Sequence, residues 1–155
     1  MKNLLGFCAV MMLLALLSAC SEAPNPPDKT TLESSAATQI QEIPAANPKA
    51  YEKLKDMSGW RNPFLILRKD GVGLFDAANY EQHIVKPDDL LQALAQLPPT
   101  AWPYGRVVAV QENGVKGTAE DDAQVRKNRA LVAGTLKSAQ VVIRWVPASL
   151  SPKTR

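Results

Sequence analysis

The sequence predicts an α+β domain in which two helices pack on a small mixed β-sheet. Four short runs rich in β-branched and aromatic residues predict strands, and two longer stretches with apolar residues at helical spacing predict helices. Their order along the chain is ββαβαβ. The two strand–helix–strand passages require crossover connections, which place parallel strands in the same sheet as the opening hairpin.

The opening pair of strands is predicted by a hairpin signal. Phe64–Arg68 and Val72–Asp76 are short apolar runs, and Asp70-Gly71 lies between them. Asp-Gly in this position favours a tight turn because both turn residues must accept positive φ. Residues 77–86 are expected to form a loop or one further short strand.

The first helix is predicted over residues 87–97. A proline suits its first turn, and the two acids that follow face the positive end of the helix dipole. Leu90, Leu94 and Leu97 recur at helical spacing, which predicts one buried face. The next strand is predicted over residues 106–111 from its β-branched content.

The second helix is predicted over residues 119–138. Thr118 offers a hydroxyl cap, and the acidic run Glu120–Asp122 occupies the first turn. The last strand is predicted over residues 141–146, where a proline follows it. Both helices therefore lead into a strand, as the predicted crossovers require.

The chain divides into four predicted parts. Residues 1–19 form a signal peptide, residues 51–147 form the α+β domain, and residues 148–155 form a frayed tail. Residues 20–50 are interpreted as a lipidated N-terminus followed by a tether rich in proline, serine and alanine. From residue 21 this stretch holds five prolines and only three large aliphatic residues, too little apolar surface to offset the entropy of ordering it.

The signal begins with one basic residue and ends in small residues. Its apolar run, Leu4–Leu17, would span about 21 Å as a helix, short of the ~30 Å hydrocarbon core of a membrane. The run closes on Leu17-Ser18-Ala19-Cys20, which resembles the lipobox of bacterial lipoprotein precursors. The resemblance implies that the Cys20 thiol is diacylated and that the chain is cleaved before it. The alternative is an ordinary signal cut nearby, or an uncleaved anchor.

Acyl chains on Cys20, palmitate among them, would tether the mature protein to a membrane without spanning it, since two or three chains anchor stably. In the enterobacterial sorting pattern, an aspartate after the cysteine retains the protein at the inner membrane. Here Ser21 follows Cys20. The resemblance therefore favours the outer membrane, with the domain facing the periplasm.

Cysteine content and charge exclude several classes of function. The two cysteines are Cys8 in the apolar run and Cys20 in the lipobox, so the domain has no disulfide framework, cysteine zinc site or thiol nucleophile. Without the signal, 17 basic residues stand against 15 acidic ones, a balance that does not predict nucleic-acid binding. No phosphate-cradling or dinucleotide-binding motif occurs, and we expect neither a cofactor nor a metal.

From Phe64 to Pro147 the elements run hairpin first, then helix, strand, helix and strand. The stretch also contains the fragment Pro103-Tyr-Gly-Arg-Val-Val108. This order resembles the periplasmic domain of the ExbD/TolR family of biopolymer-transport proteins. That family couples to protons through an aspartate on a retained membrane helix, and residues 1–20 contain no acid. The resemblance therefore implies a small envelope domain that pairs with itself or with another protein, without energy coupling.

An enzymatic role depends on few candidates. His83 is the single histidine, and it could serve as a base for Ser58 or another hydroxyl. A lone histidine in a polar segment is more often simply solvated. We therefore expect a non-enzymatic protein, with a cell-wall-directed enzyme or accessory subunit acting through carboxylates as the alternative.

Two charged clusters carry alternatives of their own. The acidic run Glu120–Asp122 could hold a hard cation, although the helix dipole alone explains acids in a first turn, and the sequence leaves this open. Arg126, Lys127 and Arg129 could meet anionic lipid or peptidoglycan. The alternative is an ordinary solvated helix face.

The segment 98–105 is the predicted recognition element. Its three prolines restrict the backbone, while Trp102 and Tyr104 are of the types that most often anchor protein interfaces. The alternative is that Trp102 packs as a lid over the sheet; Trp60 and Trp145 are expected in core or hairpin packing. The sequence thus predicts a lipid-anchored envelope domain that binds an envelope protein or a second copy of itself.

Overall fold

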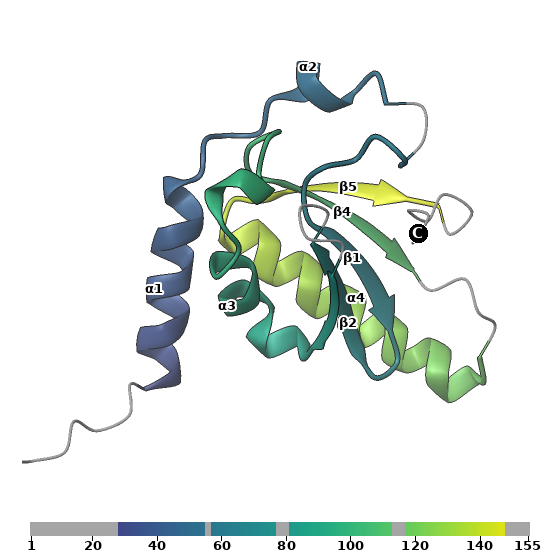
Figure 1. Ribbon diagram of the computed structural model, residues 1–155. Helices are drawn as coiled ribbons and strands as arrows, with labels where there is room; N and C mark the ends of the chain where they lie inside the picture. Colours follow the sequence, from purple (N-terminus) through teal and green to yellow (C-terminus); the bar gives the residue numbers. More distant parts are fainter. Residues whose placement is uncertain (1–27, 55–56, 77–80, 113–116, 148–155) are drawn as a thin grey trace, which may run out of the picture.

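A computed structural model describes residues 28–54, 57–76, 81–112 and 117–147 of the chain (Figure 1). The predicted signal, Cys20 and the predicted C-terminal tail lie outside these ranges. The described elements are, in chain order, α1 (Lys29–Glu42), α2 (Pro48–Tyr51), β1 (Phe64–Arg68), β2 (Gly71–Asp76), β3 (Glu81–Val85), the 3-10 turn η1 (Pro87–Asp89), α3 (Leu90–Ala95), the 3-10 turn η2 (Pro99–Ala101), β4 (Val107–Glu112), α4 (Ala119–Ser138) and β5 (Val142–Val146).

The five strands form one mixed sheet in the order β3-β2-β1-β4-β5. The β1–β2 and β2–β3 pairs are antiparallel, while β4 runs parallel to both β1 and β5. This arrangement confirms the predicted α+β class. β3 is the additional strand that the sequence left open, and β3 and β5 are the two edges of the sheet.

The β1–β2 hairpin is confirmed, but its turn lies one residue earlier than the Asp-Gly signal predicts. Arg68 pairs with Gly71, so Lys69 and Asp70 form the two-residue loop. Gly71 has φ +147°, and a Cβ added there would lie 2.7 Å from the carbonyl oxygen of Val85. Glycine is required at this position because β3 passes close to its backbone.

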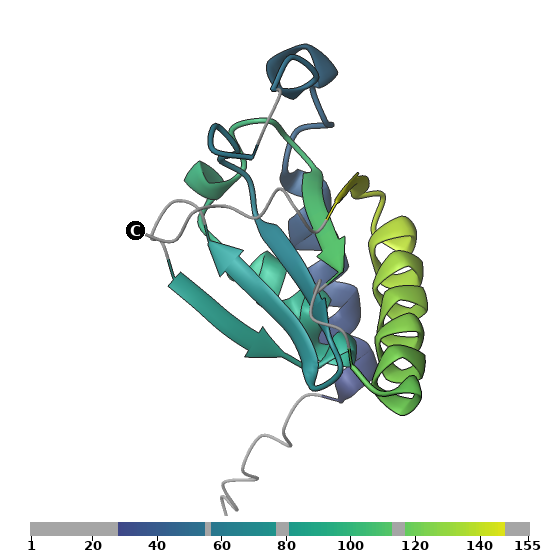
Figure 2. The same ribbon diagram turned by 90° about the vertical axis from the view of Figure 1, so that its right-hand side faces the viewer.

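α3 and α4 cover one face of the sheet, and α1 packs on α3. Figure 2 shows α4 along that face. Side chains from the strands and from α1, α3 and α4 form the larger core here; its fully buried large members are Ile40, Leu65, Leu67, Val72, Leu90, Leu94, Val108, Val110, Val132 and Leu136. Burying one such side chain typically stabilises a protein by about 1.5–3 kcal/mol, so this layer is the main source of stability.

The opposite face is covered in part by the segment that leads into β1. Tyr51 and Trp60 pack against Phe64 from β1 and Phe75 from β2. The Tyr51 and Trp60 rings meet edge to face, with their centroids 5.8 Å apart. Ala46, which precedes the predicted start of the domain at residue 51, also packs against this smaller core.

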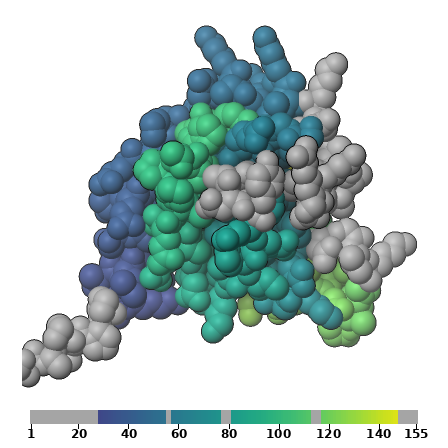
Figure 3. All heavy atoms as spheres, in the orientation of Figure 1, coloured from purple at the N-terminus to yellow at the C-terminus, as the bar shows by residue number. Residues whose placement is uncertain are grey.

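The predicted tether is wrong from residue 28 onward. α1 packs on α3, and its Ala36 and Ile40 are 4% and 0% exposed. Figure 3 shows the atoms of α1 lying against the body of the domain. Composition averaged over thirty residues concealed this helix, because its few apolar side chains fall on one side and meet apolar side chains of α3.

The segment after α1 is also fixed to the domain. The Arg106 N–H donates to the Pro44 carbonyl at 2.8 Å, and the Asn47 N–H donates to the Tyr104 carbonyl at 2.9 Å. Gly105 has φ +77°, and an added Cβ would lie 2.3 Å from the Ala45 carbonyl oxygen. The folded unit therefore includes residues 28–50, which the sequence assigned to the tether.

The start of α4 confirms the predicted cap. The Asp121 N–H donates to the Thr118 hydroxyl at 3.2 Å, and the Asp121 carboxylate accepts from the Thr118 N–H at 3.3 Å. This reciprocal pair is a capping box. It fixes the orientation of α4, the helix that runs beside β5.

Candidate protein-binding edge

β5 exposes an unpaired edge of the sheet. Its Val142 N–H donates to the Arg106 carbonyl at 2.9 Å, so Val142, Arg144 and Val146 direct their backbone groups toward β4. Because these directions alternate along a strand, Ile143 and Trp145 direct theirs toward the open side. No other described strand pairs there. Such an edge is a template for strand addition.

The β5 edge also exposes apolar side chains. Trp145 is 42% exposed and Val142 is 45% exposed. The Arg129 guanidinium lies 4.4 Å above the Trp145 ring and also donates to the Glu112 carboxylate at 2.5 Å. The expectation that Trp145 packs in the core is therefore wrong, because nothing described covers the outer side of the last strand.

Two hollows flank Trp145 and together form a groove between α4 and β5. One, of about 480 Å³, is lined by Ala133 and Lys137 from α4 and by Val142 and Ile143 from β5. The other, of about 330 Å³, has Arg129 in its lining. Trp145 lines both. An extended peptide beside β5 would therefore lie along α4 as well.

The single charge within β5 is directed away from this groove. Arg144 donates to the carbonyls of Tyr51 at 2.6 Å and Leu54 at 3.0 Å. Its guanidinium lies 5.5 Å from the Trp60 ring. These contacts connect β5 to the segment that covers the opposite face of the sheet. They leave the outer edge of β5 uncharged.

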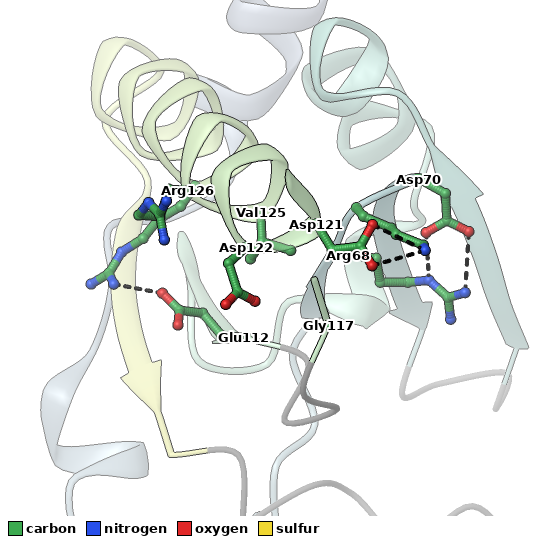
Figure 4. Close-up of a pocket in the computed structure, with 10 residues that line it drawn as sticks. Arg68, Asp70, Glu112, Gly117, Asp121, Asp122, Val125 and Arg126 are labelled. Atoms are coloured by element: carbon green, nitrogen blue, oxygen red, sulfur yellow. Dashed lines mark hydrogen bonds and ion pairs between the residues drawn. The ribbon is translucent and has the colours of Figure 1, made fainter. Parts of the chain in front are cut away.

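A large hollow, of about 620 Å³, lies where β1 and β4 end and α4 begins (Figure 4). Three of its four cationic side chains pair with three of its four carboxylates. Arg68 pairs with Asp70 at 2.8 Å, and Lys69 pairs with Asp121 at 3.1 Å. Exposed pairs of this kind contribute little stability, and they leave few charges available to a substrate.

These pairs shift the acids in the expected direction. The hydrogen bond from Lys69 lowers the pKa of Asp121, and the Thr118 N–H lowers it further. The Arg68 side chain lowers the pKa of Asp70. Backbone and Thr118 hydrogen bonds lower the pKa of Glu120. The carboxylates are thus held charged by their own neighbours, and the described residues contain no cluster of three metal-ligating side chains.

His83 lies on the other edge strand, β3. Its ring nitrogen is 3.3 Å from the Glu81 carboxylate, and both side chains are 64% exposed. A base acting on a hydroxyl needs that hydroxyl within hydrogen-bond reach. The charged group beside the His83 ring is the Glu81 carboxylate on the same strand. This arrangement gives no support to the pairing of His83 with Ser58.

Trp102 does not serve as an exposed anchor. It is 4% exposed and belongs to the core on the helix side, as the alternative proposed. Its indole Nε1 is buried and has no hydrogen-bond partner among the described residues. The prolines before it form η2, which turns the side chain inward.

Tyr104 is half-buried and bonded. Its hydroxyl donates to the Gly59 carbonyl at 2.7 Å, and its N–H donates to the Asn62 side chain at 2.9 Å. Asn62 is fully buried and donates to the carbonyls of Gly105 and Val107. Trp102 is therefore buried and Tyr104 is bonded within the domain, so the two side chains do not form the exposed anchor that the sequence predicted. Trp60, at 5% exposed, packs in the core as expected.

The sequence contained one signal for the β5 edge. Trp145 stands next to the charged Arg144 in a short strand, but only the strand order shows that this strand is at an edge. Cys20 lies outside the described residues. No helix among the described residues is long and apolar enough to cross a membrane.

Comparisons with known proteins add no relationship. No protein-family model matches the chain, and no significant match is found among curated proteins or among solved structures.

Proposed function

We propose that this protein is a lipid-anchored domain of the bacterial envelope that binds another protein through the β5 edge. The open edge of β5, with Trp145 and Val142 exposed beside it, is the observation that supports binding. Strand addition gains affinity from main-chain hydrogen bonds and specificity from side-chain pockets. The groove between α4 and β5 offers both.

The lipobox supports the anchor. Acylated Cys20 would hold the chain at the outer membrane, with the domain in the periplasm. Asp28, the cap of α1, lies eight positions after Cys20. Even fully extended, eight residue-to-residue steps reach at most about 29 Å, so the folded domain would stay close to the lipid surface.

The charges of the large hollow support a binding protein over the enzymatic alternative. Of its four carboxylates, Asp70, Asp121 and Glu112 each pair with a cation of the same domain. A catalytic acid or base of a cell-wall enzyme would need a raised or poised pKa, whereas the pKa values of Asp70 and Asp121 are lowered.

The anchor is tested by Cys20→Ala. The variant should lose all labelling by a fatty-acid probe and should not be cleaved before residue 20, because the acylated thiol is required first. Cys8→Ala is the matched control and should be labelled like the wild type. Equal labelling of Cys20→Ala and the wild type would contradict the anchor.

The binding edge is tested by Val142→Lys against Ile84→Lys. Both residues are exposed β-branched side chains on edge strands, at 45% and 54%. Val142→Lys should reduce at least tenfold the amount of partner protein recovered after chemical crosslinking of intact cells. The amount is measured by quantitative mass spectrometry. The same lysine on β3 should leave recovery unchanged. Equal recovery from both variants would reject the β5 edge.

A further inference from the structure

The wall of α4 above the β5 edge is cationic. Ala133 and Lys137 line the hollow shared with Ile143 and Trp145, which places this side of the helix over β5. Arg126 precedes Ala133 by seven residues, so it lies on the same side of the helix. Arg129 lies directly over Trp145.

Two of these three cations are available to a ligand. Arg129 is neutralised by Glu112 at 2.5 Å. Arg126 and Lys137 have no ion pair within the described ranges 28–54, 57–76, 81–112 and 117–147. Asp122, which lines the large hollow together with Arg126, is the acid nearest to them along α4. This side of α4 therefore presents one unpaired cation toward each end: Lys137 lines the groove, and Arg126 lines the large hollow.

The distance between Arg126 and Lys137 sets the spacing of two carboxylates that could reach both cations. Arg126 and Lys137 are eleven residues apart in a helix that rises about 1.5 Å per residue, or about 16 Å. A strand rises about 3.3 Å per residue, so this span equals about five strand residues. Side chains on one face of a strand recur at even intervals, which leaves intervals of four or six.

A second copy of this chain fits the edge poorly. An antiparallel β5–β5 pairing would bring the two α4 helices alongside each other, with cationic walls facing. In the register that opposes Ile143 and Trp145, the two Arg144 residues would also stand directly opposite each other. Like charges in such positions are destabilising. Charge complementarity instead favours an acidic occupant.

We propose that the β5 edge receives an extended acidic segment of a partner protein. The segment adds as a sixth strand through the backbone groups of Ile143 and Trp145. It directs two carboxylates, four or six residues apart, toward Arg126 and Lys137, and its alternate side chains are apolar and lie beside Val142. This inference rests on the proposed binding function and names the chemistry of the partner.

The test uses the full-length protein in a nonionic detergent and a nine-residue probe peptide. The peptide alternates threonine and valine, with glutamates at its third and seventh positions. Binding is followed by fluorescence anisotropy and by the amide signals of Ile143 and Trp145 in NMR. We expect the glutamate peptide to shift these two signals and to bind at least tenfold more tightly than the same peptide with lysines. Its affinity should fall as salt is raised.

Charge reversal sharpens the test. Arg126→Glu combined with Lys137→Glu should invert the preference, so that the lysine peptide binds more tightly. Lys127→Glu is the matched control, because Lys127 lies about 100° around α4 from Arg126, and it should leave the preference unchanged. Val142→Lys should weaken binding of the glutamate peptide.

Three results would overturn the inference. Equal binding of the glutamate and lysine peptides would contradict the acidic character of the partner segment and leave the proposed binding edge in place. Absence of binding to either peptide at millimolar concentration would contradict strand addition by such a segment. Dimerisation that Val142→Lys abolishes, measured by sedimentation, would identify a second copy as the occupant. Loss of acylation at Cys20 would bear on the anchor alone, so the two proposals fail separately.

Discussion

The two edges of the sheet have opposite chemistry. β3 carries Glu81, Gln82 and His83, with the acid and the histidine 3.3 Å apart, and four of its five residues are exposed. β5 carries one charge, Arg144, which is bonded on the opposite face of the sheet. Charged side chains on an edge discourage pairing with another strand. The comparison indicates that β3 is protected against pairing and that β5 is left open to it.

Exposure of single apolar residues does not distinguish the edges. Ile84 on β3 is more exposed than Val142 on β5, at 54% against 45%. The difference lies in the surroundings of the two strands. β5 runs beside α4, and Trp145 lines the groove between them, whereas β3 leads after one residue into the short turn η1. An open edge becomes a binding site when a neighbouring element provides side-chain pockets.

The largest expected effect separates the core from the β5 edge. Trp102→Ala should lower the free energy of unfolding by about 3–5 kcal/mol, because it empties a buried aromatic site. Trp102→Phe should cost far less, since it keeps most of the ring and loses only an indole N–H that has no described partner. Urea unfolding measures both. Below its melting temperature Trp102→Ala should still bind the glutamate peptide, and loss of binding with an intact fold would return this residue to the site.

An intermediate effect compares the anchoring of the two edge strands. Arg144→Ala should cost about 2–4 kcal/mol, because two carbonyls lose their donor. Hydrogen bonds from a charged group contribute about 1.5–3 kcal/mol each, and the partial exposure of Arg144 places the sum toward the lower end. His83→Ala, on the solvated edge, should change stability by less than about 0.5 kcal/mol. Thermal melting of the two variants compares them. Similar losses would mean that β5 is held no more firmly than β3.

A smaller effect concerns the helix beside β5. The folded-state pKa of Asp121 is depressed, so its contribution to stability is present above the unfolded value of about 4 and is lost as the pH falls through the lower folded value. Below about pH 4 the first turn of α4 should loosen. Urea unfolding between pH 6 and pH 2.5 should show a shallower acid loss for Asp121→Asn than for the wild type. Identical pH profiles would show that the capping box does not couple α4 to pH.

Local signals in the sequence predicted most elements well. Thr118 and the acids after it located the start of α4, because a cap is made by residues within one turn. The strand 64–68 and the return strand after Asp70-Gly71 were predicted for the same reason. The turn itself lies one residue earlier than predicted. Gly71 is required where β3 passes close to its backbone, and no local pattern reveals this contact.

The sequence did not predict α1, and the reason is different. Its isolated sequence has weak amphipathicity and no side-chain cap, so nothing local favours a helix. Ile40 becomes fully buried only because α3 is brought beside it. Helices of this length obtain most of their stability from packing, which composition does not record.

The sequence by itself determined the α+β class, the positions of the strands and of α4, and the lipobox hypothesis at Cys20, because each depends on residues within one turn or one short run. Only the tertiary structure decided which residues face a partner. It placed Trp102 inside and Trp145 outside, although both are tryptophans in apolar surroundings along the chain. The physical reason is that exposure depends on strand order and on which elements cover each face, and these are set by contacts between residues far apart in sequence.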